Sequence, residues 1–313
     1  MAIAPATTVV LVPQLPHQVT IVEVGPRDGL QVADRVLTVD QRIELIMSLA
    51  AAGTKRLEAV SFVRADAVPQ MAGAEEVIAG LPHDGGVSYI GLVLNERGLD
   101  RALATSVDEV NFVVAAADGY SIANSRMPSH EVMAQVERMA PVARQAGKRT
   151  SVTLSVAFGD PYDGEVAPER LVELADRSVQ AGIDEVALAD TIGAAVPKAV
   201  VSLIGQVRPV LGDAALRLHF HDTRRTAMAN VWAALEIGVA DFDASVGGLG
   251  GSPFAPGAGG NVATEDLLYL LERSGVDAAQ DLDAVLAVAR TLGTLLGQDL
   301  PGAVTKSGPF PPR

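Results

Sequence analysis

Eight short, mostly apolar stretches recur along the chain, and a segment with helical periodicity follows each of them. Short apolar runs of this kind are typical of buried parallel strands, and the intervening helices supply the crossovers between them. Eight such units in 313 residues predict an α/β protein with a closed (β/α)8 TIM barrel, in preference to an open doubly wound sheet. The expected strands span residues 19–24, 55–60, 88–94, 108–114, 149–156, 184–190, 216–221 and 241–246.

Glycines support this repeating pattern, since Gly53, Gly182 and Gly238 each stand between a helical segment and the next strand. Half of the fourteen positions from 247 to 260 are also glycine, which suits a mobile lid after the eighth strand. Two more helices are expected at about 263–274 and 282–296 as a C-terminal helical extension. We therefore expect a mobile leader over residues 1–18, one catalytic domain over 19–297 and a flexible tail over 298–313.

Composition narrows the classes of function. The formal net charge is −14, and no cluster of basic residues offsets it, so nucleic acid and anionic membrane surfaces are poor partners. The absence of cysteine excludes disulfides, thiolate metal sites and a cysteine nucleophile. The leader carries neither Lys nor Arg, unlike a signal peptide, and no apolar run reaches the roughly 18 residues of a membrane span. A cytoplasmic protein is expected.

Polar residues gather where the predicted strands end, which is where barrels of this class build their active sites. His219 and His221 alternate on one strand, so they share a face roughly 6.6 Å apart and can close on one metal ion. Two imidazoles with one carboxylate and one amide oxygen form a ligand set that suits Mg²⁺ or Mn²⁺ better than structural zinc. The loop after the eighth strand contains no phosphate-binding P-loop pattern.

Taken singly, several of these residues also have purely structural interpretations. An arginine next to an aspartate is often a surface ion pair, a carboxylate after a strand can cap a helix, and a loop serine can be part of a lid. The ion pair is the alternative for Arg27 with Asp28, the helix cap is the alternative for Asp190, and the lid is the alternative for Ser252. Glu58 alone would more often be a solvent contact at a strand end or a partner of Lys55 or Arg56.

Three motifs in order strengthen the functional interpretation: VEVGPRDGLQ at 22–31, HFHDT at 219–223, and GLGGSPFAPGAGGN at 248–261. Together they resemble the signatures of the 3-hydroxy-3-methylglutaryl-CoA lyase family, one of the DRE-TIM metallolyases. Weaker matches lie between them, including Asn124 and the Asp190-Thr191-Ile192-Gly193 run. The resemblance extends over residues 19 to 297.

The resemblance implies a retro-Claisen cleavage of an acyl-CoA thioester, 3-hydroxy-3-methylglutaryl-CoA, to acetyl-CoA and acetoacetate. It implies that Arg27 polarises the thioester carbonyl and stabilises the enolate, and that Glu58 and Asp190 orient or help to deprotonate the C3 hydroxyl. Asn124 would contact the substrate together with Arg27, and the protein would form a homodimer or a larger homo-oligomer. The divalent cation, Mg²⁺ or Mn²⁺, would be held by Asp28, His219, His221 and Asn261.

The chain departs from the family pattern at three places. Ser252 stands where the family has a catalytic cysteine, and a hydroxyl is a poorer proton donor or acceptor near neutrality than a thiol. Arg224 and Arg225 replace the usual Tyr-Gly and are predicted to bind substrate at the mouth of the barrel, while residues 32–34 lack the expected lysine. Two alternatives therefore stand: a related carbon–carbon lyase or synthase on another 3-hydroxy-3-alkyl acyl-CoA, and a weakly catalytic barrel that binds metal and acyl-CoA.

Overall fold

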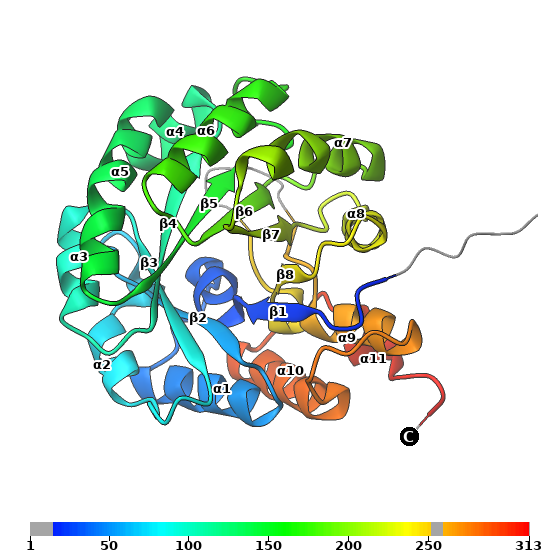
Figure 1. Cartoon of the computed structure of the whole chain (residues 1–313). Coiled ribbons are helices and arrows are strands. Elements are labelled where there is room, and N and C mark those ends of the chain that lie inside the picture. The colour runs from blue at the N-terminus through cyan, green and yellow to red at the C-terminus, as the bar shows by residue number, and fades with distance from the viewer. Residues whose placement is uncertain (1–14, 252–258, 313) are drawn as a thin grey trace, which may run out of the picture.

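The computed structural model describes residues 15–251 and 259–312, and in it eight parallel strands close into a barrel (Figure 1). Each strand pairs with the next one in sequence, and β1 also pairs with β8 to close the ring. The predicted (β/α)8 barrel is confirmed. The strands are β1 (Thr20–Glu23), β2 (Arg56–Ser61), β3 (Ser88–Val93), β4 (Glu109–Ala115), β5 (Arg149–Ser155), β6 (Glu185–Asp190), β7 (Ala215–Phe220) and β8 (Asp241–Ala244).

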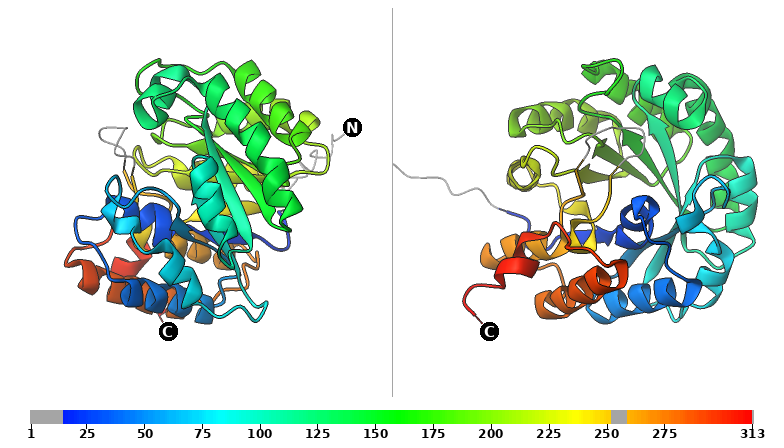
Figure 2. Two further views of the ribbon diagram at one scale, coloured as in Figure 1. Left: turned by 90° about the vertical axis from the view of Figure 1, so that its left-hand side faces the viewer. Right: turned by 180° about the vertical axis from the view of Figure 1, so that it is seen from behind.

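Helices surround the barrel, as both views in Figure 2 show. The C-terminal helical extension packs beside the first helix of the barrel, since α10 lies against α1 and α9. Within the described ranges, none of these helices is both long and apolar enough to cross a membrane. The helices are α1 (Val39–Ala51), α2 (Ala74–Ala79), α3 (Glu96–Leu103), α4 (Asp118–Ser125), α5 (Ser129–Gln145), α6 (Pro168–Gln180), α7 (Pro197–Val207), α8 (Ala227–Glu236), α9 (Thr264–Arg273), α10 (Leu282–Leu296) and α11 (Ala303–Ser307).

Local chemistry explains where several elements begin and end. Thr38 starts α1 with a capping box, in which its hydroxyl accepts from the Gln41 amide and the Gln41 side chain accepts from the Thr38 amide. At the other end of α1, Gly53 has a φ of 104°, and a β-carbon there would meet the Ala279 carbonyl oxygen at 2.4 Å. Glycine is therefore required where the chain leaves this helix and enters β2.

Two helices lie where the sequence pattern did not place one. The helix α4 follows β4 ahead of the predicted α5, and the short helix α11 lies inside the segment expected to be a flexible tail. A side-chain contact ties α11 to the domain, since the Thr305 hydroxyl donates to Glu265 Oε1 at 2.5 Å. The predicted leader falls largely on residues 1–14, outside the described residues.

Charged side chains form a buried layer at the amino ends of the strands. Arg56 pairs with Glu109 at 2.7 Å and with Glu185 at 2.9 Å, and Arg217 pairs with Glu185 at 2.7 Å. Burial alone would raise the pKa of Glu185, but Arg217 and Arg56, together with Arg149, outweigh it and hold the pKa at about 2. Removing one member of such a buried pair typically costs about 3–5 kcal/mol, so this layer fixes the end of the barrel opposite the candidate site.

Candidate active site

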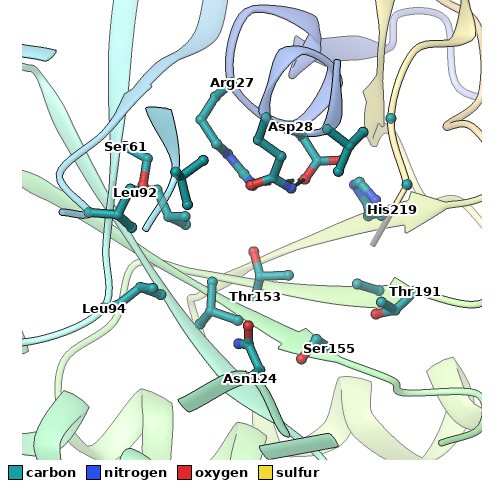
Figure 3. Close-up of a pocket in the computed structure, with 18 of the residues that line it drawn as sticks. Arg27, Asp28, Ser61, Leu92, Leu94, Asn124, Thr153, Ser155, Thr191 and His219 are labelled. Atoms are coloured by element: carbon teal, nitrogen blue, oxygen red, sulfur yellow. Dashed lines mark hydrogen bonds and ion pairs between the residues drawn. The ribbon is translucent and has the colours of Figure 1, made fainter. Parts of the chain in front are cut away.

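A tight turn after β1 presents the first two polar residues of the site. The turn spans Gly25–Gly29 and carries Arg27 and Asp28 to the carboxyl end of the barrel. At Gly25 a β-carbon would lie 2.6 Å from Glu23 Oε1, so only glycine allows the turn to fold this closely onto the strand. Figure 3 shows Arg27 and Asp28 pointing from this turn toward a cavity. The sequence pattern thus placed both side chains correctly.

The two histidines meet Asp28 at this end of the barrel. His219 lies on β7 and His221 directly beyond it, and the possible ligand atoms of Asp28, His219 and His221 all lie within 4.8 Å of one another. His221 also bridges to Asn261 across the backbone, which brings the fourth predicted ligand to the group. The structure therefore brings the four predicted metal ligands together.

The hydrogen bonds of these residues fit a bound cation. Nδ1 of His219 lies 3.0 Å from Asp243 Oδ2, and Nδ1 of His221 lies 2.9 Å from the Gly259 carbonyl oxygen. With Nδ1 donating in both cases, each Nε2 keeps a lone pair for a metal ion. Asn261 Nδ2 donates to Asp28 at 2.8 Å, while its buried Oδ1 has no hydrogen-bond partner among residues 15–251 and 259–312. An orphaned buried oxygen next to two imidazoles and a carboxylate suits Mg²⁺ or Mn²⁺.

The protonation of these groups also follows from their surroundings. Burial raises the pKa of Asp28, but the charge of Arg27, the two neighbouring imidazoles and the hydrogen bond from Asn261 together outweigh burial, so the pKa lies below its ordinary value and the group is ionised. Burial, helped by the neighbouring imidazole of His219, lowers the pKa of His221 to about 4. Burial also opposes the charged form of His219, but the hydrogen bond to Asp243 and the negative charges of Asp243 and Asp28 together outweigh burial and raise the pKa of His219. Asp28 and His221 are therefore in ligand form at neutral pH.

Arg27 is held from two sides. Its Nε donates to Glu58 Oε2 at 2.6 Å and its Nη1 donates to Asp28 Oδ1 at 2.7 Å. The other oxygen of Glu58 accepts from Asn111 Nδ2 at 2.9 Å. Glu58 is thus neither a solvent contact nor a partner of the basic residues at the start of β2. Both of its oxygens are engaged, and one of them fixes Arg27.

Asp190, the second predicted carboxylate, ends β6 and holds the loop that follows. Its two oxygens accept from the amides of Ala194 at 2.8 Å and Ala195 at 3.0 Å. Burial raises its pKa above the ordinary value although these bonds oppose the rise. Asp190 therefore holds the loop ahead of α7 but does not cap this helix, whose N-cap is Val196 and has no side-chain cap. Its neighbour Thr191 lines the cavity.

A cavity of about 750 Å³ opens over these residues. Arg27, Asp28, His219 and His221 form part of its wall, and Asn124, a predicted substrate contact, lies on it as well. Figure 3 shows the two sides facing each other, with Arg27 and Asp28 opposite Thr153, Asn124 and Ser155. The cavity therefore offers cationic and metal-ligating groups on one side and neutral hydrogen-bonding groups on the other.

The two arginines predicted at the mouth make other contacts. Arg224 Nη1 donates to the carbonyl oxygens of Ile192 at 2.7 Å and Gly193 at 3.0 Å, which ties two loops together. Arg225 pairs with Asp222 at 3.0 Å, and neither arginine is among the residues that line the cavity. Their contact with substrate stays a prediction. Ser252 lies outside the described residues.

Sequence reasoning missed two groups that support the site. Asp243 on β8 accepts from His219 and also pairs with Arg217 on β7 at 2.5 Å. Asn111 on β4 contacts Glu58. A signal for Asp243 was present, because Arg217 and His219 alternate on one strand and Asp243 alternates with Asp241 on the next, so opposite charges on neighbouring strands could have been paired. No comparable local signal marked Asn111.

Comparisons with known proteins agree with this geometry. The HMGL-like family model matches residues 18–292. The chain is 41% identical over 305 residues to the (R)-citramalyl-CoA lyase of Chloroflexus aurantiacus, covering 94% of this chain and 96% of that protein. It is 44% identical over 282 residues to the hydroxymethylglutaryl-CoA lyase of Pseudomonas mevalonii, covering 89% and 93%.

Solved structures give the same result. A structure of an HMG-CoA lyase from Acinetobacter baumannii in complex with coenzyme A and 3-methylmalate superposes with a TM-score of 0.91. It is 37% identical in sequence, and the match covers 94% of this chain and 96% of that one. Likeness of this extent reaches beyond the barrel architecture to the sequence of the whole domain.

Proposed function

The chain belongs to the HMGL-like family, and from this premise we propose that it is a divalent-metal-dependent acyl-CoA lyase. Its substrate is 3-hydroxy-3-methylglutaryl-CoA or a close analogue, cleaved by retro-Claisen reaction to acetyl-CoA and acetoacetate. The observation that carries the proposal is the convergence of Asp28, His219 and His221 donor atoms within 4.8 Å, beside Arg27 in one cavity. Relatives named as lyases of such thioesters support it.

Asp28, His219, His221 and Asn261 would hold the cation. When bound, a Mg²⁺ or Mn²⁺ ion there supplies Lewis-acid polarisation of substrate oxygens. The neutral form of His221 and the ionised form of Asp28 at physiological pH are the states that such binding requires.

Arg27 acts on the thioester carbonyl. As the C2–C3 bond breaks, its electron pair moves onto C2 and the carbonyl oxygen, which gains negative charge as an enolate. A guanidinium fixed by Glu58 and Asp28 is ready to donate to that oxygen without reorganising. Such donors typically lower the activation free energy by about 2.7–4 kcal/mol. Glu58 therefore orients Arg27.

The C3 hydroxyl must lose its proton as C3 becomes a ketone. Both predicted carboxylates accept hydrogen bonds at both oxygens: Glu58 from Arg27 and Asn111, and Asp190 from the amides of Ala194 and Ala195. Their protonation therefore decides between them. Asp190 has a pKa raised by burial, and a pKa nearer to the working pH favours proton uptake. We assign proton acceptance to Asp190. The enolate then takes a proton at C2 to give acetyl-CoA, and Ser252, at the family's cysteine position, is the residue that the sequence offers for this step.

A second candidate substrate has specific support, because one relative at 41% identity is named (R)-citramalyl-CoA lyase. In citramalyl-CoA the second carboxylate is bonded directly to C3, so the same bond cleavage yields acetyl-CoA and pyruvate. The substitution of Ser252 for cysteine also fits a shift in specificity within the family.

A panel of 3-hydroxyacyl-CoA thioesters tests the proposal. Each is incubated with the protein and Mg²⁺ or Mn²⁺, and acetyl-CoA, acetoacetate and pyruvate are quantified. Acetyl-CoA with acetoacetate from 3-hydroxy-3-methylglutaryl-CoA supports the first substrate, and acetyl-CoA with pyruvate from citramalyl-CoA supports the second. Binding of the thioesters without any product would leave the barrel as a binding protein and overturn the proposal.

A further inference from the structure

A cluster of polar side chains lies inside the barrel below the cavity. Glu58 on β2, Asn111 on β4 and Ser151 on β5 are 1%, 2% and 0% exposed, and Thr153 lies two residues along β5. Branched apolar side chains usually fill this region of such a barrel. Buried polar groups lower stability unless they are fully hydrogen-bonded. The hydrogen bonds within this cluster therefore indicate which side chains it orients.

The bonds of Asn111 fix how its amide is oriented. Its Nδ2 donates to Glu58 Oε1 at 2.9 Å and approaches Thr153 Oγ1 at 3.1 Å. Its Oδ1 accepts from Ser151 Oγ at 3.1 Å and from Thr153 Oγ1 at 3.2 Å. Because the hydroxyls of β5 supply donors to Oδ1, the amino group of Asn111 is turned toward Glu58.

This contact crosses the barrel interior, since β3 lies between β2 and β4. Glu58 therefore sits between two donors on different elements: Asn111 Nδ2 on Oε1 and Arg27 Nε on Oε2 at 2.6 Å. A carboxylate accepting at both oxygens from fixed donors cannot rotate freely. Because Arg27 donates to Glu58, the orientation of the Glu58 carboxylate determines the position of the Arg27 guanidinium, whose Nη1 also donates to Asp28.

We propose that Asn111 is a positioning residue that sets the guanidinium of Arg27 through Glu58, a role that rests on the proposed function of Arg27 as the enolate stabiliser. Without the amide, Glu58 Oε1 would be a buried oxygen without its donor, and the carboxylate would turn to recover one. Arg27 would follow, and a displacement of about 1 Å at a catalytic group can lower the rate about a hundredfold.

Kinetics of Asn111→Val test this coupling. We expect kcat to fall about ten- to a hundredfold, while KM for the cleaved thioester changes by no more than about twofold, because Asn111 is not among the residues that line the cavity. In an Arg27→Met background the same substitution should add little further loss, since its route to the reaction is already removed. An equal loss in both backgrounds would mean a general structural role and would overturn the proposal.

Ser151→Ala is the matched control. It deletes a buried hydroxyl from the same cluster, but Asn111 Oδ1 keeps Thr153 as a donor and the bond to Glu58 is untouched. We expect kcat within about twofold of the wild type. Thermal unfolding followed by circular dichroism checks that both variants are folded, so that a loss in Asn111→Val alone is assigned to the amide.

A spectroscopic readout separates this inference from the proposed function. In ¹⁵N-labelled protein the Arg27 Nε–H signal, assigned by its disappearance in Arg27→Met, should exchange slowly with water in the wild type and in Ser151→Ala. In Asn111→Val it should exchange much faster or broaden, because Glu58 no longer holds it. If the wild type cleaves no thioester, the proposed function fails, but this signal still tests whether Asn111 positions Arg27 through Glu58. An unchanged signal in Asn111→Val would overturn the inference.

Discussion

At the scale of single residues, the position of Arg27 between two carboxylates decides what its substitution should do. Arg27→Met removes a hydrogen-bond donor that interacts most strongly with the substrate when the enolate forms. We therefore expect the activation free energy to rise by about 2.7–4 kcal/mol, which lowers kcat about a hundred- to a thousandfold. KM should change far less. Steady-state kinetics on the active thioester measure both, and an unchanged kcat with a raised KM would make Arg27 a residue of substrate binding alone.

Ser252 lies outside the described residues, and the expectation for it rests on its place in the sequence motif. If the lyase acts on 3-hydroxy-3-methylglutaryl-CoA with a weak proton donor at this position, Ser252→Cys should raise kcat on that thioester and make the enzyme sensitive to thiol alkylation. Ser252→Ala should cost little. A cysteine variant no faster than the wild type would instead favour a shift to another substrate. The cysteine-free wild type is the built-in alkylation control.

The residues of the candidate site differ in how far the sequence could predict them. Asp28, His219 and His221 were identifiable because strand alternation and strand-end position place them without knowledge of the three-dimensional pairing. Asn261 needed the family motif as well. The pairing of Glu58 with Asn111 joins two strands that are not neighbours, and the distance across a barrel interior depends on strand tilt and stagger, which no local pattern encodes.

At the scale of elements, β7 and β8 cooperate to orient a metal ligand. Asp243→Asn replaces the carboxylate that accepts from His219 Nδ1, and loss of such a partner typically weakens metal affinity about 10- to 100-fold. Titration calorimetry with Mn²⁺ measures this directly. Asp241→Asn, on the same strand but two residues away, is the control and should bind Mn²⁺ as the wild type does. Equal affinity in Asp243→Asn would contradict the assigned orientation.

The end of β1 offers a prediction about stability. Glu23 is fully buried and accepts from the Gly25 and Val246 amides and from Thr264. Burial raises its pKa from 4.5 to about 7, although these bonds oppose the rise. The folded state then binds the proton more tightly than the unfolded state, so this group's contribution is fully present below about pH 4.5 and is lost as the pH rises to about 7.

Glu23→Gln removes the free-energy cost of a buried ionised carboxylate while keeping an oxygen acceptor and the shape of the side chain. We expect the variant to be more stable than the wild type at pH 8, by on the order of 1–3 kcal/mol, with the advantage shrinking toward pH 4.5. Denaturant unfolding at the two pH values gives the difference. A variant that is less stable at pH 8 would show that the ionised carboxylate with its three donors is the favoured form.

At this scale the sequence predicted the eight strands and most of their helices, because helix-ending glycines and short apolar runs are local signals. It did not predict α4 or α11. Both are short, and α11 depends on tertiary contacts: the Ala303 and Val304 amides donate to Asp266 on α9. Short helices are marginal without such contacts, so their sequences alone carry a weak signal.

At the scale of the whole molecule, the barrel separates stability from chemistry. The ion pairs of Arg56, Glu185 and Arg217 lie at the amino ends of the strands, and the candidate site lies at the carboxyl ends. Arg217 links the two, because it pairs with Glu185 in the first group and with Asp243, the partner of His219, in the second. The predicted homodimer or larger oligomer stays a prediction, which the mass in solution by light scattering would test.

Metal dependence of thioester cleavage tests the central claim most directly. The measurement is acetyl-CoA release from 3-hydroxy-3-methylglutaryl-CoA and citramalyl-CoA by protein stripped with a chelator and then titrated with Mg²⁺ or Mn²⁺, for the wild type and His219→Ala. We predict no release without the ion, restored release with it in the wild type, and none in His219→Ala although that variant stays folded. Release that survives the chelator, or that survives the loss of His219, would contradict the assignment of this site.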